Sequence, residues 1–333
     1  MNYPKITVVV CTLNEENHIA QCLNSVLGQD YPGNIDIIVA DGGSQDATIS
    51  ILGNFALKYS NIKLIDNPNK IQSSGRNLAV SKCETEFIAY LDAHYIARKD
   101  WISKMFDILI QQKNNNINIA GVGTAYYNLS DNEISLGYTA AVSSIICGAP
   151  KEHLLNNNKI TQTDHALMCI YYRNIFKLNG GYDEKLPVGE DYEFNVRLIQ
   201  KGYKIFQTDE KLVGYYPRTT FESIAKQQFN YGYWRQIVSK KLNKFSLISL
   251  IPAIFVLIMI ILFLISFLNP TVFVGYFVIL ILYMFTLLTA GALIGLRRQG
   301  NPIMIAVSAL VIHFSYGAGS LSALYKLLTR TNA

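Results

Sequence analysis

Residues 5–11 read KITVVVC, a continuous apolar run rich in β-branched side chains. Such a run is typical of a strand that is buried on both faces of a parallel sheet. Similar runs return at 35–41 (IDIIVAD) and 86–92 (EFIAYLD), and segments with helical periodicity lie between them. This alternation predicts βαβ units, and therefore a mostly parallel sheet flanked by helices.

The alternation continues over roughly the first two hundred residues. Asn14 is a candidate N-cap for the first helix, and another helix is expected to begin near Glu190. Residues 126–160 show no clear pattern. Further strands are expected at 61–67 and 117–125, and helices at 14–29, 73–83, 100–112 and within 188–203.

Polar residues gather where three of the predicted strands end, at 11–15, 41–44 and 92–94. In open α/β sheets, ligands bind outside the carboxyl ends of the strands. We therefore expect these clusters to share one crevice. The motifs G-x-G-x-x-G and G-x-x-x-x-G-K-[ST] are both missing, which excludes a standard dinucleotide-binding fold and a P-loop enzyme.

Asp92 and His94 stand two residues apart at one of these strand ends. A carboxylate oxygen and an imidazole nitrogen can both bind one divalent cation, and the nitrogen favours Mn²⁺ over Mg²⁺. For the tripeptide alone, an Asp that caps a turn beside a solvated His is the plainer explanation. The metal hypothesis therefore depends on the other motifs.

Charge divides the chain into two parts. Up to Glu222 there are 24 acidic and 20 basic residues, a net charge of −4, whereas the nine charged residues beyond it are all Lys or Arg. The pI near 8.8 therefore reflects the end of the chain and does not indicate nucleic-acid binding. Because these basic residues flank long apolar stretches, we expect them to face anionic membrane lipid.

The late apolar stretches are candidates for membrane spans. Residues 247–268 and 271–296 contain no charge, and about 20 apolar residues suffice to cross a bilayer core. Asn269-Pro270 should make these two a tight hairpin. A third stretch, 302–324, is weaker because it contains His313, several Ser and two Gly. Residues 221–245 mix apolar and basic residues, as an amphipathic interfacial helix does.

The positive-inside rule suggests an orientation. Basic clusters at 240–244 and 297–298 flank the first two stretches, which places them and the N-terminal domain in the cytoplasm. Three full spans would leave Lys326 and Arg330 outside, against the rule, so the third stretch either spans nevertheless or is re-entrant; we expect a span. The expected domains are a catalytic domain at 1–217, an interfacial helix region at 218–246 and a membrane domain of about three helices at 247–325.

The cysteines point to a reducing compartment. The five residues are scattered and form no Cys-x-x-Cys motif, which fits reduced, mostly buried thiols in the cytosol and not a structural zinc site. No signal peptide is visible, because the first apolar run, 6–11, is too short.

Four motifs in order resemble an inverting family 2 glycosyltransferase with a GT-A fold. They are VVVCTLNEE (8–16), ADGGSQDAT (40–48), LDAH (91–94) and VGEDYEFNVRL (188–198), and the resemblance covers about residues 5–215. The Asp-Ala-His variant, the segment at 215–236 and HFSYGAGSL (313–321) are similar to the succinoglycan-type membrane glucosyltransferases of exopolysaccharide assembly. Most of the family has Asp-x-Asp where this chain has Asp92-Ala93-His94.

The resemblance implies roles for the polar residues. Asp191 would be the catalytic base, with Glu190 beside it, and Asp92 and His94 would hold the cation that stabilises the leaving diphosphate. Asp41 would accept the uracil N3–H. Plainer structural roles remain open: a tight turn at 41–43, a helix start at Asn14 and Glu15, and an acidic pair at 190–191 that only satisfies a helix dipole. The remaining nucleotide-binding candidates are Thr12, Asn14, Glu15, Arg76 and Asp92.

Four further residues are candidates for contacts with the acceptor or the diphosphate. Gln228, Trp234 and Arg235 either make such a contact or belong to a basic aromatic belt at the membrane surface. His165 either lines the acceptor pocket or is, as we expect more, a buried and hydrogen-bonded histidine.

Together these features predict inverting transfer of a hexosyl residue, glucosyl above all, from a UDP-sugar to a lipid-linked saccharide. The chain would be a multi-pass protein of the cell membrane that acts in cell-surface polysaccharide assembly with other assembly proteins. One alternative is a polyisoprenyl-phosphate sugar synthase, whose acceptor is the lipid phosphate itself. Another is a membrane-anchored module that binds nucleotide without turnover. A processive polymerase and a transporter fit the few spans less well.

Overall fold

The structure, a computed structural model, describes residues 3–130, 132–148, 159–298 and 300–330. The chain divides into two compact units. The first comprises residues 1–128 and 156–216, and the second comprises 129–155 and 217–333. Part of the segment 126–160, which shows no clear sequence pattern, thus belongs to the second unit.

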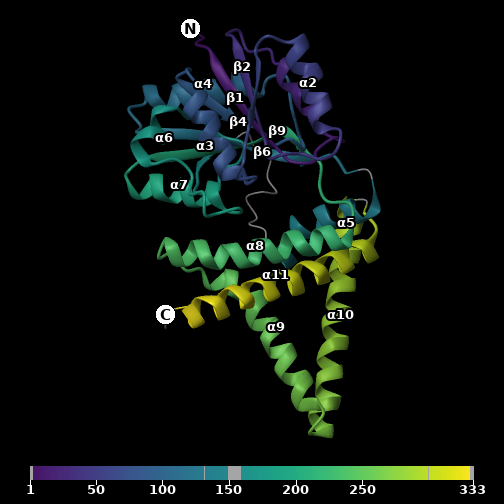
Figure 1. The fold of residues 1–333 in the computed structure, drawn as a ribbon. Helices are drawn as coiled ribbons and strands as arrows, with labels where there is room; N and C mark the ends of the chain where they lie inside the picture. The colour runs from purple at the N-terminus through teal and green to yellow at the C-terminus, as the bar shows by residue number, and fades with distance from the viewer. Residues whose placement is uncertain (1–2, 131, 149–158, 299, 331–333) are drawn as a thin grey trace. The chain divides into compact units, whose positions relative to one another are not determined.

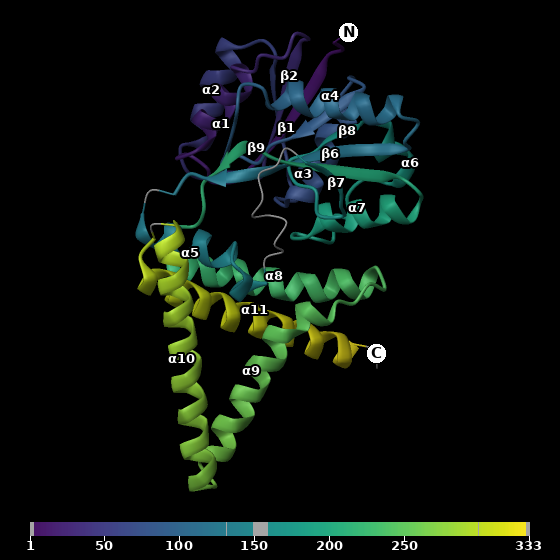
Figure 2. The same ribbon diagram turned by 180° about the vertical axis from the view of Figure 1, so that it is seen from behind.

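The first unit is a mixed sheet with helices on both sides (Figures 1 and 2). The strands lie in the order β3-β2-β1-β4-β8-β6-β9-β5, and β7 pairs with β9. The elements are β1 (Ile6–Thr12), α1 (Ile19–Leu27), β2 (Ile35–Asp41), α2 (Thr48–Lys58), β3 (Ile62–Asp66), α3 (Gln72–Lys82), β4 (Phe87–Tyr90), β5 (Tyr95–Ala97), α4 (Trp101–Asn114), β6 (Ile119–Asn128), β7 (Ile160–Gln162), β8 (Ile170–Tyr172), α6 (Asn174–Asn179), α7 (Glu190–Gln200) and β9 (Lys204–Tyr215).

The parallel part of the sheet is the part that the sequence predicts. β2, β1 and β4 pair in parallel, and their apolar side chains, such as Ile6, Val8 and Ile37, are buried in the core. The register places Thr12 opposite Asp41, so the two residues end neighbouring strands at one edge. β4 then pairs antiparallel with β8, and β8 with β6, which makes the sheet mixed.

The first helix is shorter than predicted. α1 begins at Ile19, and Asn14 does not cap it. The backbone N–H groups of Asn14 and Glu15 instead donate to the side chains of Ser44 (2.9 Å) and Thr48 (2.8 Å). These donors are satisfied by the segment after β2, so residues 14–18 form turns rather than a first helical turn.

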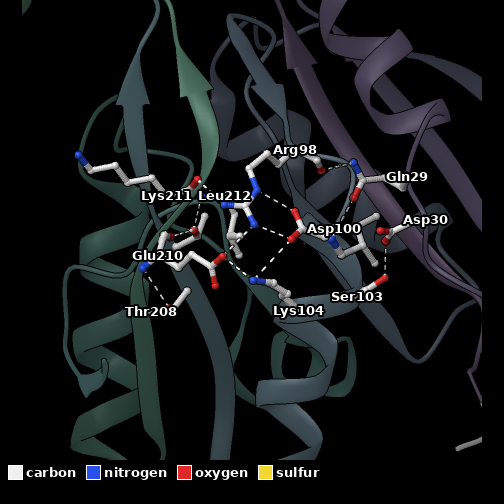
Figure 3. Close-up of polar contacts among 12 residues, drawn as sticks. Gln29, Asp30, Arg98, Asp100, Ser103, Lys104, Thr208, Glu210, Lys211 and Leu212 are labelled. Carbon is white, nitrogen blue, oxygen red and sulfur yellow. Dashed lines mark hydrogen bonds and ion pairs between the residues drawn. The ribbon is translucent and has the colours of Figure 1, made fainter. Parts of the chain in front are cut away.

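An ion-pair cluster joins the start of α4 to β9 (Figure 3). The Arg98 guanidinium binds Asp100 at 2.5 Å and Glu210 at 2.8 Å, and Lys104 also binds Glu210. The hydrogen bond from Arg98 lowers the pKa of Asp100. The cluster fixes the β5–α4 connection, and β5 alone separates this connection from the turn that carries Asp92 and His94.

The second unit is helical. It contains α5 (Glu133–Val142), the 3-10 helix η1 (Ile145–Cys147), α8 (Phe221–Lys241), α9 (Leu247–Ser266), α10 (Pro270–Arg298) and α11 (Pro302–Arg330). Among the described residues, three helices are long and apolar enough to cross a membrane, namely α9, α10 and α11. His313 on α11 contacts neighbouring elements through Tyr283 and the Ile146 carbonyl, as expected of a packing residue.

Candidate active site

The centre of the site is Arg76, which lies in the second turn of α3. Its guanidinium donates to Asp92 at 3.0 Å and to Glu190 at 2.9 Å. These carboxylates come from the end of β4 and the start of α7, so one side chain joins elements far apart in the sequence. Arg76 is only 6% exposed, which makes both ion pairs charge-assisted contacts in a dry environment.

Two tyrosines hold this guanidinium in place. The Arg76 group lies over the rings of Tyr90 (5.2 Å) and Tyr182 (5.4 Å). Burial acts to lower the pKa of Arg76, but the charges of Asp92 and Glu190 outweigh it and raise that pKa. Gln72, the first residue of α3, also donates to the Asp92 oxygen that Arg76 binds. Gln72 was not among the predicted site residues, because a single Gln at a helix start gives no signal in sequence.

The two acidic residues at the start of α7 have different environments. Glu190 is 4% exposed, and burial raises the pKa of its carboxyl to about 8 although the Arg76 charge lowers it. Asp191 is half-buried, and its carboxylate accepts the N–H of Tyr192 at 2.7 Å. Gly189 permits this arrangement, since its φ of 80° is one that side-chain-bearing residues rarely adopt. Asp191 is therefore the acid that a substrate can reach.

His94 forms a pair with Glu15 at the end of β1. Its Nδ1 lies 3.0 Å from Oε1 of Glu15, and both side chains are partly buried. A carboxylate partner stabilises the tautomer that carries its proton on Nδ1, which leaves the lone pair on Nε2. The carboxylate of Glu15 contacts His94, and the predicted contact of Glu15 with the nucleoside remains a prediction.

The donor atoms of Asp92 and His94 suit a divalent cation. Among the described residues, the contacts of the Asp92 carboxylate all involve Oδ1, which leaves Oδ2 open, and Nε2 of His94 likewise makes no hydrogen bond. No cluster of three or more His, Cys, Asp or Glu side chains able to hold a metal occurs in the described residues. A cation here would thus have two protein ligands and take the others from substrate or water.

Asp41 organises the turn that follows β2. Its carboxylate accepts the backbone N–H groups of Gly43 (2.7 Å) and Ser44 (2.9 Å), and also the Ser44 hydroxyl. Asn14 accepts the N–H of Gln45 at 2.8 Å. Together with the Glu15–His94 pair, these bonds connect the three polar clusters at the carboxyl edge of the sheet, as the sequence predicts.

Thr12 has an unused hydroxyl at this edge. Its side chain is 5% exposed, and its Oγ1 has no hydrogen-bond partner within the described part of the chain. The Ser73 hydroxyl, on the first turn of α3, is also buried and unpartnered there. Buried hydroxyls normally have partners, so Thr12 is a candidate for a ligand contact, whereas Ser73 is fully buried.

His165 is exposed, and the expectation that it is buried is wrong. Its side chain is 51% exposed, because its segment lies outside the sheet between β7 and β8. The His165 ring packs on the ring of Tyr192, with 4.5 Å between the centroids, and Tyr192 directly follows Asp191 in the sequence. Nδ1 of His165 lies 2.5 Å from Oδ1 of Asp164. His165 therefore lies close to the start of α7, where an acceptor contact remains a prediction.

The candidates on α8 belong to the second unit and are described by their contacts there. The amide of Gln228 is buried and donates to the Tyr138 hydroxyl at 2.9 Å. Trp234 packs edge-on against Tyr233, at 5.3 Å between ring centroids. Gln228 and Trp234 thus contact other residues of the helical unit, and the side chain of Arg235 is half-buried. Acceptor or diphosphate contacts by these residues remain predictions.

The mixed sheet and its acidic carboxyl edge agree with the GT-A fold that the motifs predict. Residues 7–178 match the family described as Glycosyl transferase family 2, and this match covers just over half of the chain. The chain belongs to this family, which is an inverting one.

Curated relatives agree with this assignment. The chain is 26% identical over 265 residues to "Dolichyl N-acetyl-alpha-D-glucosaminyl phosphate 3-beta-D-2,3-diacetamido-2,3-dideoxy-beta-D-glucuronosyltransferase" of Methanococcus voltae, covering 76% of this chain and 78% of the relative. It is 28% identical over 228 residues to "Succinoglycan biosynthesis protein ExoA" of Rhizobium meliloti, covering 68% and 67%. The resemblance to succinoglycan-type enzymes is thus confirmed as distant homology.

A solved structure shares the fold over almost the whole chain. "Mannosyltransferase PcManGT from Pyrobaculum calidifontis in complex with GDP-Man and Mn2+" superimposes with a TM-score of 0.55 at 15% identity, covering 99% of this chain and 80% of that one. S. aureus TarS gives a TM-score of 0.51 at 20% identity, covering 74% and 45%. The expected GT-A fold is therefore confirmed.

Proposed function

We propose that this enzyme transfers a hexosyl residue, glucosyl in the first instance, from a UDP-sugar to a lipid-linked saccharide with inversion. The observation that carries this proposal is the arrangement around Arg76, which joins Asp92 to Glu190 and leaves the neighbouring Asp191 accessible. Such a site has the parts needed to hold a diphosphate and to deprotonate an acceptor hydroxyl beside it.

Each side chain has a distinct task in this proposal. Asp191 accepts the proton of the acceptor hydroxyl as that oxygen attacks the anomeric carbon. Glu190 keeps Arg76 in position, and the positive charge of Arg76 attracts the diphosphate as negative charge develops on it. Asp41, with Thr12 and Asn14 on the neighbouring strand end, lines the nucleoside.

Asp92 and His94 are the residues that would hold the divalent cation, Mn²⁺ in preference to Mg²⁺ because one ligand is a nitrogen. When bound, such an ion supplies Lewis-acid stabilisation of the leaving diphosphate. Oδ2 of Asp92 makes no contact within the described residues, so this carboxylate oxygen is open to a cation. Glu15 orients His94 for this role.

The names of the relatives support the acceptor class. One relative is named for action on a dolichyl-linked sugar phosphate, and another for succinoglycan biosynthesis. A lipid-linked acceptor also explains long apolar helices on this enzyme, and we place the catalytic unit in the cytoplasm by the positive-inside rule. Incubation of the enzyme with UDP-glucose, Mn²⁺ and either lipid-linked saccharides or polyisoprenyl phosphate alone tests this choice. Labelling of the lipid phosphate alone would identify the synthase alternative, and donor binding without any turnover would identify a binding module.

Asp41 is predicted to determine donor affinity. Asp41→Asn removes the charge that would bind the base, and a charge-assisted hydrogen bond contributes about 1.5–3 kcal/mol, so the donor KM should rise about tenfold or more. Initial rates over a range of UDP-sugar concentrations measure this. Asp66→Asn is the matched control, because exposed Asp66 pairs with Asp41 across β2 and β3. An unchanged KM in a folded Asp41→Asn enzyme would remove this role.

Glu15 is predicted to strengthen cation binding through His94. In Glu15→Gln, the group that pairs with Nδ1 of His94 becomes neutral, and Nε2 of His94 therefore becomes a weaker metal ligand. The affinity for Mn²⁺ in the presence of UDP should fall about 10- to 100-fold. Titration of Mn²⁺ followed by electron paramagnetic resonance measures it, and pulsed spectra should show imidazole ¹⁴N coupling in the wild type. Exposed Glu84→Gln serves as the control. Equal Mn²⁺ affinity in wild type and Glu15→Gln would refute the orienting role.

A further inference from the structure

α11 differs from the other two apolar helices in how it is covered. The apolar windows of α9 and α10 are 17% and 11% buried, with mean hydropathies of 3.2 and 2.5, whereas that of α11 is 44% buried with a mean hydropathy of 1.6. Every residue of α11 from 304 to 321 is buried or half-buried by the other helices of its unit. Its middle therefore offers no fully exposed side chain to lipid.

The helix that covers α11 most closely is α8. A Cβ atom on Gly232 of α8 would lie 2.1 Å from the Tyr316 carbonyl oxygen, and one on Gly319 of α11 would lie 2.0 Å from that of Phe229. Gly232 and Gly319 thus allow backbone contact between α8 and α11, whereas Gly317 of α11 makes a similar close approach to Pro252 of α9. Figures 1 and 2 both show α11 running alongside α8 and crosswise to α9 and α10.

Contacts on either side of these glycines continue the packing. Ile224, near the start of α8, packs in one cluster with Ile305 and Ala309 of the first half of α11. Near the other end of α11, the Lys326 ammonium donates to the Tyr233 hydroxyl at 2.8 Å. The two helices are therefore joined along their lengths, and α11 can cross a bilayer only if α8 crosses with it.

α8 is unsuited to cross. Its exposed charges include Glu222, Lys226, Lys240 and Lys241, and it carries polar side chains at its centre, such as Gln227 and Asn230. Arg235 is the charge nearest its middle, and an Arg at the centre of a spanning helix costs about 2.5–3.5 kcal/mol. α8 is accordingly not among the helices with the hydropathy of a span in the described residues.

We propose that the chain crosses the bilayer twice, through α9 and α10, and that α8 and α11 lie together on the lipid surface on one side. α9 has 20 residues, a length of about 30 Å, which matches a hydrocarbon core. The turn between α9 and α10 then lies on the far side, and its Leu268 is 85% exposed. This inference rests on membrane attachment of the proposed enzyme, but not on its donor or acceptor.

The distribution of charge agrees with two spans. All nine basic residues beyond Glu222 then lie on one side of the membrane, and Lys326 and Arg330 no longer oppose the positive-inside rule. A third span, which the sequence alone favours, would require Lys326 to be far from α8, whereas it contacts Tyr233. The proposed surface partner is the anionic headgroup layer of the membrane.

Cysteine labelling in intact cells tests the topology. In full-length chains whose five native cysteines are replaced by alanine, single cysteines are introduced as Lys240→Cys, Leu268→Cys and Tyr325→Cys, all at exposed positions. A membrane-impermeant maleimide should label Leu268→Cys from the side that holds the α9–α10 turn. It should label Lys240→Cys and Tyr325→Cys only from the opposite side, which holds α8 and α11. Labelling of Tyr325→Cys together with Leu268→Cys, but not with Lys240→Cys, would demonstrate a third span and overturn the proposal. Labelling of all three positions from the same side would also overturn it, because α9 would then not cross the membrane.

Fusions to the chain with its native cysteines provide a second readout. A fluorescent protein at the C-terminus should fluoresce in the cytoplasm, and alkaline phosphatase at the same point should be inactive. Active phosphatase at the C-terminus would again overturn the two-span topology. Because neither readout requires glycosyl transfer, a failed activity assay would contradict the proposed function without affecting this inference.

Discussion

Asp191→Asn is expected to reduce glycosyl transfer about a thousandfold while leaving the affinity for the nucleotide sugar unchanged. Loss of a general base costs about 10²–10⁴ in rate, because the acceptor hydroxyl then attacks with its proton in place. Asparagine keeps the size of the side chain and can still accept the N–H of Tyr192, so α7 should begin as before. Steady-state transfer rates and calorimetric UDP binding measure the two effects.

Exposed Glu184→Gln is the matched control for this variant, because it neutralises a carboxylate on the segment that leads to α7. It should retain wild-type transfer. Retained turnover in Asp191→Asn would eliminate the proposed base, and weakened UDP binding would show that Asp191 acts on the donor.

Asp92→Asn is expected to abolish the response of the enzyme to Mn²⁺ and to lower transfer at least a hundredfold. A metal contributes several kcal/mol to stabilising a leaving diphosphate, and each 1.36 kcal/mol is about tenfold in rate. Wild-type activity should fall on addition of a chelator and return with added Mn²⁺, whereas the variant should not recover. The arrangement of Arg76 should largely persist, since Glu190 still binds it.

The control here is Asp36→Asn, whose carboxylate pairs with Lys5 near the opposite end of β2. It should respond to Mn²⁺ as the wild type does. Full Mn²⁺-dependent activity in Asp92→Asn would refute the ligand assignment. Wild-type activity that resists chelation would refute the metal itself.

Strands of the sheet could be predicted from the sequence where they coincide with long apolar runs. The strand predicted at 35–41 matches β2 at both ends, because a buried parallel strand is apolar over its whole length. The antiparallel strands β5, β7 and β8 have three residues each, too few to show a period, and were missed. Tertiary pairing rather than local preference forms such strands.

The sequence predicted which residues form the site but not the contacts between them. The motifs gave Asp92 and Glu190, and Arg76 was a separate candidate, yet nothing in the spacing shows that the Arg76 guanidinium joins the two carboxylates. The Glu15–His94 pair was likewise hidden, because it joins strand ends 79 residues apart. The exposure of His165 depends on the course of its loop, which local sequence does not determine.

The configuration of the transferred sugar tests the proposed reaction most directly. The purified full-length enzyme would be given UDP-glucose, whose glucose is α-linked, together with Mn²⁺ and lipid-linked saccharide acceptors, and the product examined by proton NMR. Single displacement at the Arg76 site with Asp191 as base predicts a β-linked glucosyl product that forms with the wild type and not with Asp191→Asn. An α-linked product, or equal product from both enzymes, would contradict it.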